Sequence, residues 1–206
     1  MFRMRVALFG GTFDPIHRGH LAVATAAADA FALDQVIFAP VGLQPLKTAT
    51  VAAPFADRLA MTMLAVASAA EPRFVVSGID APRADGLPNY TADTLTDLGR
   101  NLPQATLFAL TGADSFLTLR QWRSSVKLLE LAEWIVVSRP EFSLSDAQLD
   151  QLHFTPEQRA RVHLLTTVHE DISATDLRHR LQAGDPCTGL IPAAVAEYIQ
   201  THHLYR

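Results

Sequence analysis

The sequence has one cysteine, no long apolar run and no excess of positive charge, and each of these absences excludes a class of protein. A single cysteine, Cys187, excludes an intrachain disulfide framework and a cysteine-rich zinc site. Apolar residues make up 49% of the 206 residues, enough for a substantial core. No run approaches the roughly 20 uncharged apolar residues that span a membrane. The net charge of −4 disfavours broad binding to nucleic acid, although a small local anion site is compatible with it. The first residues lack the pattern of a signal peptide, so we expect a cytoplasmic globular protein.

Short apolar runs alternate along the chain with longer segments that have a helical pattern. The runs are rich in β-branched and aromatic residues and are continuous, as in parallel strands that are covered on both faces. The predicted strands are residues 5–9, 35–39, 74–77, 106–110, 134–137 and 162–165. The predicted helices are residues 20–31, 55–69, 91–101, 124–132, 175–182 and 193–203. This order predicts an α/β fold with a doubly wound parallel sheet and extra C-terminal helices, in a single domain over residues 1–206.

Individual residues indicate where these helices end and which face they bury. Thr91 has a side chain of the type that caps a helix N-terminus. Gly184 is typical of the position just after a helix C-terminus, and Pro192 suits a first turn. For the second predicted helix, helical spacing predicts an apolar face made of Phe55, Leu59, Met63 and Val66.

The segment between the first predicted strand and the first predicted helix has the features of an anion-binding loop. Gly10 and Gly11 permit close approach of the backbone to a ligand, and the helix that follows begins with unpaired N–H groups. His17 and His20 are three residues apart. Three interpretations are open: the histidines cap the helix or pack in the core, they ligate a metal, or they donate hydrogen bonds to phosphate. The glycines favour phosphate, and no further metal ligand is evident nearby.

A second candidate phosphate site follows the last predicted strand. Ser173 and Asp176 have the spacing of a capping box, and Thr175 is an alternative N-cap. Either choice places Arg178 in the first two turns of a helix, where a cation opposes the helix dipole and a bound anion reverses the disadvantage. We therefore expect Arg178→Ala to be no less stable in the absence of a bound anion. An ordinary surface arginine is the alternative.

The glycine-rich segment resembles a known signature. Gly10-Gly-Thr-Phe-Asp-Pro-Ile-His-Arg-Gly-His20 is similar to the Gly-Gly-x-Phe-Asp-Pro-x-His-x-Gly-His motif of the nucleotidyltransferase superfamily. Later segments resemble one branch of it, the bacterial nicotinate-nucleotide adenylyltransferases. These segments are Tyr90-Thr-Ala-Asp-Thr-Leu95, Gly112-Ala-Asp-Ser115 followed by Trp122, Ser138-Arg-Pro140, Ile172-Ser-Ala-Thr-Asp-Leu-Arg178, and the ending from Ile191 to Tyr205. The likeness covers nearly the whole chain in the same order.

This resemblance implies a Rossmann-like enzyme that transfers AMP from ATP to nicotinate mononucleotide, giving deamido-NAD and pyrophosphate in NAD biosynthesis. It implies Mg²⁺ as a cofactor that accompanies ATP, no metal site made by the protein alone, and neither nucleic acid nor membrane as a partner. The implied catalytic residues are His17, His20, Lys47 and Arg178. The implied ATP-binding residues are Gly10, Gly11, Thr12, Phe13, Gly112, Asp114, Ile172, Ser173, Thr175 and Arg178. The implied mononucleotide-binding residues are Tyr90, Thr91, Trp122 and Arg139.

The loop over residues 40–47 departs from the family pattern, in which Pro-Asn is followed by Pro-Pro-His-Lys or a close variant. Pro45 and Lys47 are retained, but Val41 replaces the asparagine and Leu46 replaces the histidine. Backbone N–H groups at the start of the helix after Tyr90 suit a carboxylate, so we expect preference for the nicotinate form. The alternatives are an adenylyltransferase for nicotinamide mononucleotide or for both forms, one for phosphopantetheine, a catalytically silent nucleotide-binding protein, and a metal-binding protein.

Overall fold

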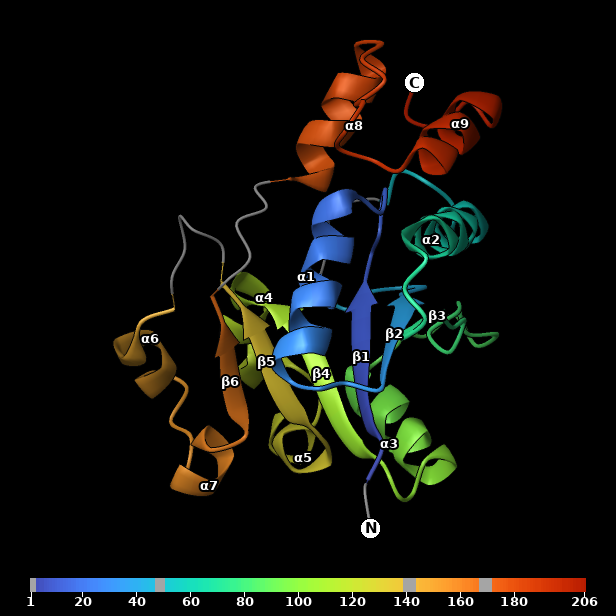
Figure 1. The fold of residues 1–206 in the computed structure, drawn as a ribbon. Coiled ribbons are helices and arrows are strands. Elements are labelled where there is room, and N and C mark those ends of the chain that lie inside the picture. Colours follow the sequence, from blue (N-terminus) through green and yellow to red (C-terminus); the bar gives the residue numbers. More distant parts are fainter. Residues whose placement is uncertain (1–2, 47–50, 139–143, 167–171) are drawn as a thin grey trace.

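The computed structural model describes residues 3–46, 51–138, 144–166 and 172–206. In these segments the strands are β1 (Arg5–Gly11), β2 (Gln35–Pro40), β3 (Phe74–Val76), β4 (Thr106–Gly112), β5 (Glu133–Val137) and β6 (Val162–Leu165). They form one parallel sheet in the order β3-β2-β1-β4-β5-β6 (Figure 1). All six predicted strands are therefore present, and β1 and β4 flank the point where the strand order reverses. In doubly wound sheets, ligands bind at the carboxyl ends of the strands beside this switch point.

The central strand β1 shows why its apolar run is continuous. Val6 and Leu8 belong to the core on one face of the sheet, whereas Ala7 and Phe9 belong to the core on the other face. Successive strand residues point to opposite faces, so a strand that is covered on both sides needs apolar residues at every position.

Helices cover both faces of the sheet, as a doubly wound fold requires. One core includes buried residues of α1 (Arg18–Ala30), α2 (Phe55–Ala69), α8 (Ala174–Gln182) and α9 (Ala193–Thr201). The other core includes buried residues of α3 (Thr91–Asn101), α4 (Ala113–Leu117), the 3₁₀ turn η1 (Leu119–Gln121), α5 (Ser125–Leu131) and α6 (Asp146–Asp150). The short helix α7 (Pro156–Arg159) leads into β6. Figure 1 shows α8 and α9 beyond the carboxyl ends of the strands, which confirms the predicted C-terminal helices.

The predicted first residues of α3 and α9 are confirmed, but the roles predicted for Thr91 and Pro192 need correction. Tyr90, not Thr91, is the N-cap of α3, because Tyr90 has an extended backbone and its carbonyl accepts the Asp93 and Thr94 N–H groups. Pro192 likewise precedes the first helical residue of α9 and is its N-cap. Gly184 follows the C-cap of α8 with a φ of +83°, as predicted for a residue that must adopt a left-handed conformation.

The predicted buried face of α2 is largely wrong, although Val66 does pack against the core. Arg58, Met61, Thr62 and Ala65 are buried, whereas Met63 is 57% exposed. The buried face of α2 includes an arginine and a threonine. A prediction that considers only the spacing of apolar residues therefore misses this face. In the part of the chain that the structure describes, no helix is long and apolar enough to cross a membrane.

Candidate active site

The loop between β1 and α1 lies at the carboxyl edge of the sheet, beside the switch point. Its two glycines differ in what surrounds them. A Cβ atom on Gly11 would lie 2.9 Å from the Phe13 ring, so packing of that ring requires glycine there. A Cβ atom on Gly10 would meet nothing within 4 Å. Gly10 therefore borders open space at the end of a central strand, where a ligand can approach the backbone.

The geometry of His17 and His20 defines which ring nitrogen can bind an anion. The rings lie 3.7 Å apart between centroids, and the backbone N–H of His17 donates to Nδ1 of His20 at 3.2 Å. That bond requires an unprotonated Nδ1, so the proton of the neutral His20 ring is on Nε2. His17 is the N-cap of α1 and is buried, whereas His20 is half-buried. Nε2 is thus the nitrogen of His20 that carries the N–H group.

Asp14 anchors the same loop from within the protein. Its carboxylate accepts hydrogen bonds from the backbone N–H groups of Ala52 and Ala53, at 2.7 and 3.1 Å, and from the Tyr205 hydroxyl at 2.7 Å. The Asp14 side chain is buried, and its three donors come from two distant segments of the chain. Three donors on one buried carboxylate stabilise its charge and fix the loop.

Arg58 is a buried cation beneath this loop, and the sequence analysis missed it. Its guanidinium donates to the carbonyls of Thr12, Val41 and Ala53, at 2.6, 2.8 and 3.2 Å. Burial lowers the pKa of Arg58, and the nearby Asp14 carboxylate opposes that change. In the sequence, Arg58 stands three residues after Phe55 in a predicted helix that must bury one of its faces. That position is the only sequence feature that could have marked Arg58 as buried.

Arg178 on α8 connects the second predicted phosphate motif to the first. Its Nη1 donates to the carbonyl of Asp14 at 2.8 Å, and its Nη2 donates to Thr175 Oγ1 at 3.1 Å. The two motifs are therefore in contact although 164 residues separate them. Two of the five N–H groups of the guanidinium are used, which leaves donors for an anion.

The start of α8 only partly matches its prediction. Ser173 is the N-cap, so the alternative assignment to Thr175 is wrong. The predicted capping box with Asp176 is absent, because the Ser173 side chain makes no capping hydrogen bond and Asp176 pairs with Arg180 at 2.8 Å. Ile172 is buried in the core, so only its backbone is available to a ligand.

Other predicted ATP-binding residues divide between the carboxyl edge of the sheet and the core. Gly112 and Asp114 follow β4, the neighbour of β1, and a Cβ atom on Gly112 would lie 2.8 Å from Asp114 Oδ1. Asp114 is exposed in the first turn of α4. Thr12 Oγ1 donates to Gln44 at 3.3 Å. Phe13 is packed among core rings, so its side chain lies away from the open space.

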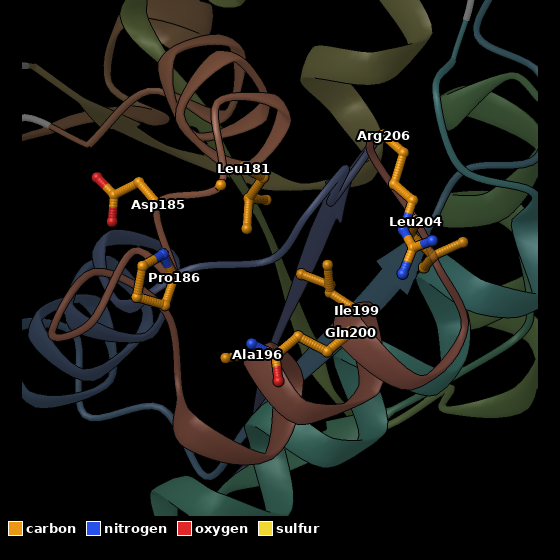
Figure 2. Close-up of a pocket in the computed structure, with 9 residues that line it drawn as sticks. Leu181, Asp185, Pro186, Ala196, Ile199, Gln200, Leu204 and Arg206 are labelled. Atoms are coloured by element: carbon orange, nitrogen blue, oxygen red, sulfur yellow. The ribbon is translucent and has the colours of Figure 1, made fainter.

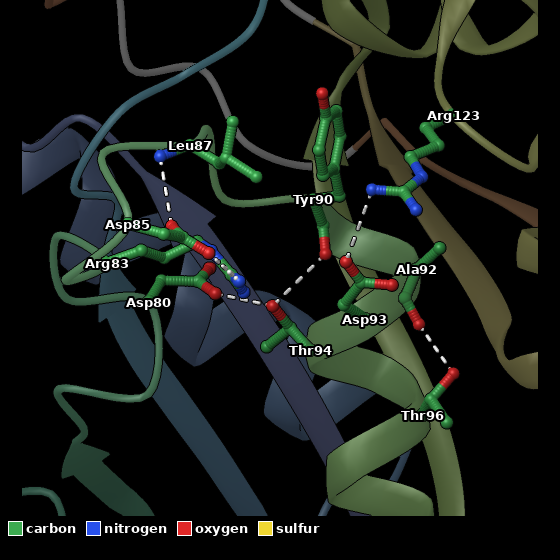
Figure 3. Close-up of polar contacts among 10 residues, drawn as sticks. All are labelled: Asp80, Arg83, Asp85, Leu87, Tyr90, Ala92, Asp93, Thr94, Thr96 and Arg123. Atoms are coloured by element: carbon green, nitrogen blue, oxygen red, sulfur yellow. Dashed lines mark hydrogen bonds and ion pairs between the residues drawn. The ribbon is translucent and has the colours of Figure 1, made fainter.

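The start of α3 forms the second half of the candidate site (Figure 3). Among the described residues, no acceptor contacts the backbone N–H groups of Thr91 and Ala92. The Arg123 guanidinium lies 4.6 Å from the centre of the Tyr90 ring, and its Nη1 is 3.8 Å from Asp93. The start of α3 therefore offers two backbone donors to an anion, while the Asp93 carboxylate offsets the charge of Arg123.

Trp122 precedes Arg123 in the chain and is packed against the core on one side. Its Nε1 donates to Thr118 Oγ1 at 3.0 Å, and its ring meets the Trp134 ring edge-on at 5.9 Å between centroids. The side chain is half-buried against the core, so part of it remains accessible. The remaining predicted site residues, Lys47 and Arg139, lie outside the residues that the structure describes.

Figure 3 also shows a buried carboxylate behind the start of α3. Asp80 is 7% exposed and accepts a hydrogen bond from the Thr94 hydroxyl. Burial raises the pKa of Asp80, and the Thr94 hydrogen bond acts in the opposite direction. The folded state therefore favours the neutral form of the Asp80 carboxyl over its ionised form.

A Rossmann-type sheet with a glycine-rich loop at its switch point is the architecture of a nucleotide-binding α/β protein. Residues 8–180 match the family model described as cytidylyltransferase-like. The chain is 44% identical over 204 residues to a probable nicotinate-nucleotide adenylyltransferase of Leifsonia xyli, covering 99% of this chain and 95% of that one. It is 43% identical to a probable nicotinate-nucleotide adenylyltransferase of Streptomyces coelicolor, covering 96% and 98% of the two chains.

Solved structures agree in fold. The structure of Plasmodium falciparum nicotinic acid mononucleotide adenylyltransferase complexed with NaAD matches with a TM-score of 0.79 and 18% identity, over 98% of this chain and 97% of that one. The chain belongs to the cytidylyltransferase-like family and, within it, to the nicotinate-nucleotide adenylyltransferases. The family predicted from the sequence motifs is therefore confirmed.

Proposed function

We propose that this chain transfers the adenylyl group of ATP to nicotinate mononucleotide, giving deamido-NAD and pyrophosphate, as a step in NAD biosynthesis. The observation that carries the proposal is the hydrogen bond from Arg178 to the Asp14 carbonyl, which joins the two phosphate motifs at one edge of the sheet. The printed functions of the relatives support it. We further propose that residues 1–206 act as one cytoplasmic nucleotidyltransferase domain, with neither nucleic acid nor membrane as a partner.

The reaction requires little covalent chemistry from the protein. The phosphate of the mononucleotide has a second pKa near 6, so it is mostly a dianion at pH 7. One of its oxygens attacks the α-phosphorus of ATP and forms the new P–O bond. The bond from the α-phosphorus to the bridging oxygen breaks, and pyrophosphate leaves with the electron pair. No side-chain base is needed, and the protein contributes positioning and stabilisation of charge.

The geometry suggests a role for each group that faces the open space. Gly10 lets the triphosphate approach the backbone at the end of β1, and His20 donates from Nε2 to a phosphoryl oxygen. Arg178 uses its remaining N–H groups on the leaving phosphates. In this proposal the backbones of Gly11, Thr12, Phe13 and Ile172 line the nucleotide, His17 orients His20, and Lys47 adds a cation. The remaining ATP contacts are Gly112, Asp114, Ser173 and Thr175.

The start of α3 is proposed to hold the pyridine ring. Trp122 stacks on the ring, and Tyr90 and Arg139 complete the pocket. The Thr91 and Ala92 N–H groups, which lack acceptors among the described residues, receive the carboxylate. A carboxamide would set its own NH₂ group against one of these donors or leave a donor unpaired, at about 1–3 kcal/mol each. We therefore propose selectivity for the acid form over the amide form.

Mg²⁺ fits this site only as a companion of ATP. Among the described residues, no three His, Cys, Asp or Glu side chains gather where they could hold a metal ion. Mg²⁺ commonly binds through substrate phosphates and water, with few protein ligands. When bound with the triphosphate, it would neutralise charge on the phosphoryl oxygens.

The direct test measures pyrophosphate release from ATP with nicotinate or nicotinamide mononucleotide, with the dinucleotide identified by mass. We expect kcat/KM to favour the nicotinate form roughly 10²-fold, as two donors at about 1–3 kcal/mol each predict. Values within a factor of about three would show a dual-specific enzyme. Binding of ATP without pyrophosphate release would show a catalytically silent protein.

A pair of histidine variants tests the phosphate assignment. His20→Ala should lower kcat about 10²-fold or more, the scale of losing one donor to the transition state. His179→Ala is the control, because His179 is an exposed residue next to Arg178. Stoichiometric zinc in the active protein, lost in His20→Ala, would instead support a metal site.

A further inference from the structure

The segment after α9 contacts the loop between β1 and α1. Tyr205 is 7% exposed, and its hydroxyl donates to Asp14 Oδ1 across a separation of 191 residues. Its neighbours Leu204 and Arg206 line a cavity of about 380 Å³ between α8 and α9 (Figure 2). The backbone N–H of Leu204 donates to the Ile199 carbonyl of α9 at 3.0 Å, which ties the segment to that helix.

Asp14 presents two different groups to two different partners. Its carboxylate accepts the Tyr205 hydroxyl together with the Ala52 and Ala53 N–H groups. Its backbone carbonyl accepts Nη1 of Arg178. Both groups belong to one residue, so a shift of the Asp14 backbone after loss of a carboxylate partner would also move the carbonyl that accepts from Arg178.

Tyr205 is suited to act as a permanent donor. Burial raises the pKa of the Tyr205 hydroxyl, the adjacent Asp14 carboxylate raises it further, and the Arg178 and Arg58 charges partly oppose this. Without the hydroxyl, the two backbone donors would hold Asp14 from one segment only. The Asp14 carbonyl would then be held less firmly, and Thr175 Oγ1 would be the remaining fixed partner of Arg178 among the described residues.

We propose that Tyr205 is a positioning residue for the triphosphate, because its hydroxyl fixes Asp14 and thereby the carbonyl that orients Arg178. This inference rests on the proposed function, in which Arg178 binds the phosphates of ATP. Tyr205 itself touches no substrate. Its removal should therefore impair ATP use and leave the binding of the mononucleotide, at the start of α3, nearly unchanged.

The test compares Tyr205→Phe with Tyr198→Phe. Both tyrosines lie in the C-terminal part of the chain and donate to an aspartate, Tyr198 to Asp57 Oδ1 at 2.9 Å, so each variant loses one hydroxyl. Steady-state kinetics are measured below the lower melting temperature of the two variants. Tyr205→Phe should raise KM for ATP about tenfold and change KM for the mononucleotide less than about twofold. Tyr198→Phe should change neither constant.

A double-variant cycle separates positioning through Arg178 from a general loss of stability. Because Tyr205 acts through Arg178, Tyr205→Phe should have little further effect on ATP affinity in an Arg178→Ala background. Additive effects, equal effects of the two tyrosine variants, or an unchanged KM for ATP in Tyr205→Phe would each overturn the inference.

The same cycle is repeated by calorimetric titration with ATP alone. If the wild-type chain binds ATP but releases no pyrophosphate, the proposed function fails while the coupling between Tyr205 and Arg178 is still measured.

Discussion

Replacement of Arg58 by methionine removes a buried cation that holds three segments together. The guanidinium is 1% exposed and donates to carbonyls in the loop after β1, the loop after β2 and the segment before α2. Methionine has a similar length and fills most of the space, so the loss of packing is small. The variant thus removes three hydrogen bonds and one of the positive charges near the Asp14 carboxylate.

The expected loss of stability is large for a single substitution. Removal of one partner from a buried charge interaction costs about 3–5 kcal/mol, and each acceptor left without a donor contributes about 1–3 kcal/mol of that loss. Domains are stable by only about 5–15 kcal/mol. With a urea m-value of about 2 kcal/mol/M, a loss of about 4 kcal/mol lowers the unfolding midpoint by about 2 M.

The assay is equilibrium unfolding in urea, followed by tryptophan fluorescence, with Arg73→Met as the matched control. Arg73 also bonds to several oxygens, but these belong to the Glu71 and Asp29 side chains at the surface, where ion pairs contribute little. The control should therefore keep nearly the wild-type midpoint. A shift of less than about 0.5 M for Arg58→Met, or equal shifts in both variants, would refute the reasoning about Arg58.

Three further substitutions test the site. Arg178→Ala should raise KM for ATP far more than KM for the mononucleotide, with Arg180→Ala as the control. Contrary to the expectation from the helix dipole, the ligand-free Arg178→Ala chain should lose about 1 kcal/mol in thermal unfolding, because its hydrogen bond to the Asp14 carbonyl outweighs the dipole. Asp80→Asn should stabilise the protein at neutral pH, because the pKa of Asp80 is raised in the folded state and its ionisation therefore destabilises the fold. Melting temperatures measured across pH should show this gain disappear as the pH falls below the usual pKa range of aspartate, where Asp80 is neutral in both the folded and the unfolded chain. Trp122→Ala should weaken both mononucleotides together, since an indole face stacks on either ring, and a change in their ratio would contradict this.

Local patterns in the sequence were sufficient for the sheet, the main helices and the family. A strand covered on both faces must be apolar throughout, so β1, β2 and β4 to β6 are visible as short apolar runs. The glycine-rich loop is also local, because its glycines and histidines lie within 11 consecutive residues. The short helices α4, α6 and α7 were not predicted, since five residues or fewer carry too little periodicity.

Only the tertiary structure decided how the site is held together. The bonds from Tyr205 and Arg178 to Asp14 join residues that are 191 and 164 positions apart, and no local pattern marks such pairs. The buried face of α2 depends on Arg58, which is inside because three carbonyls from other segments surround it. A charged residue can be buried only where the rest of the fold supplies its partners, so its position follows from the assembled chain and not from its own helix.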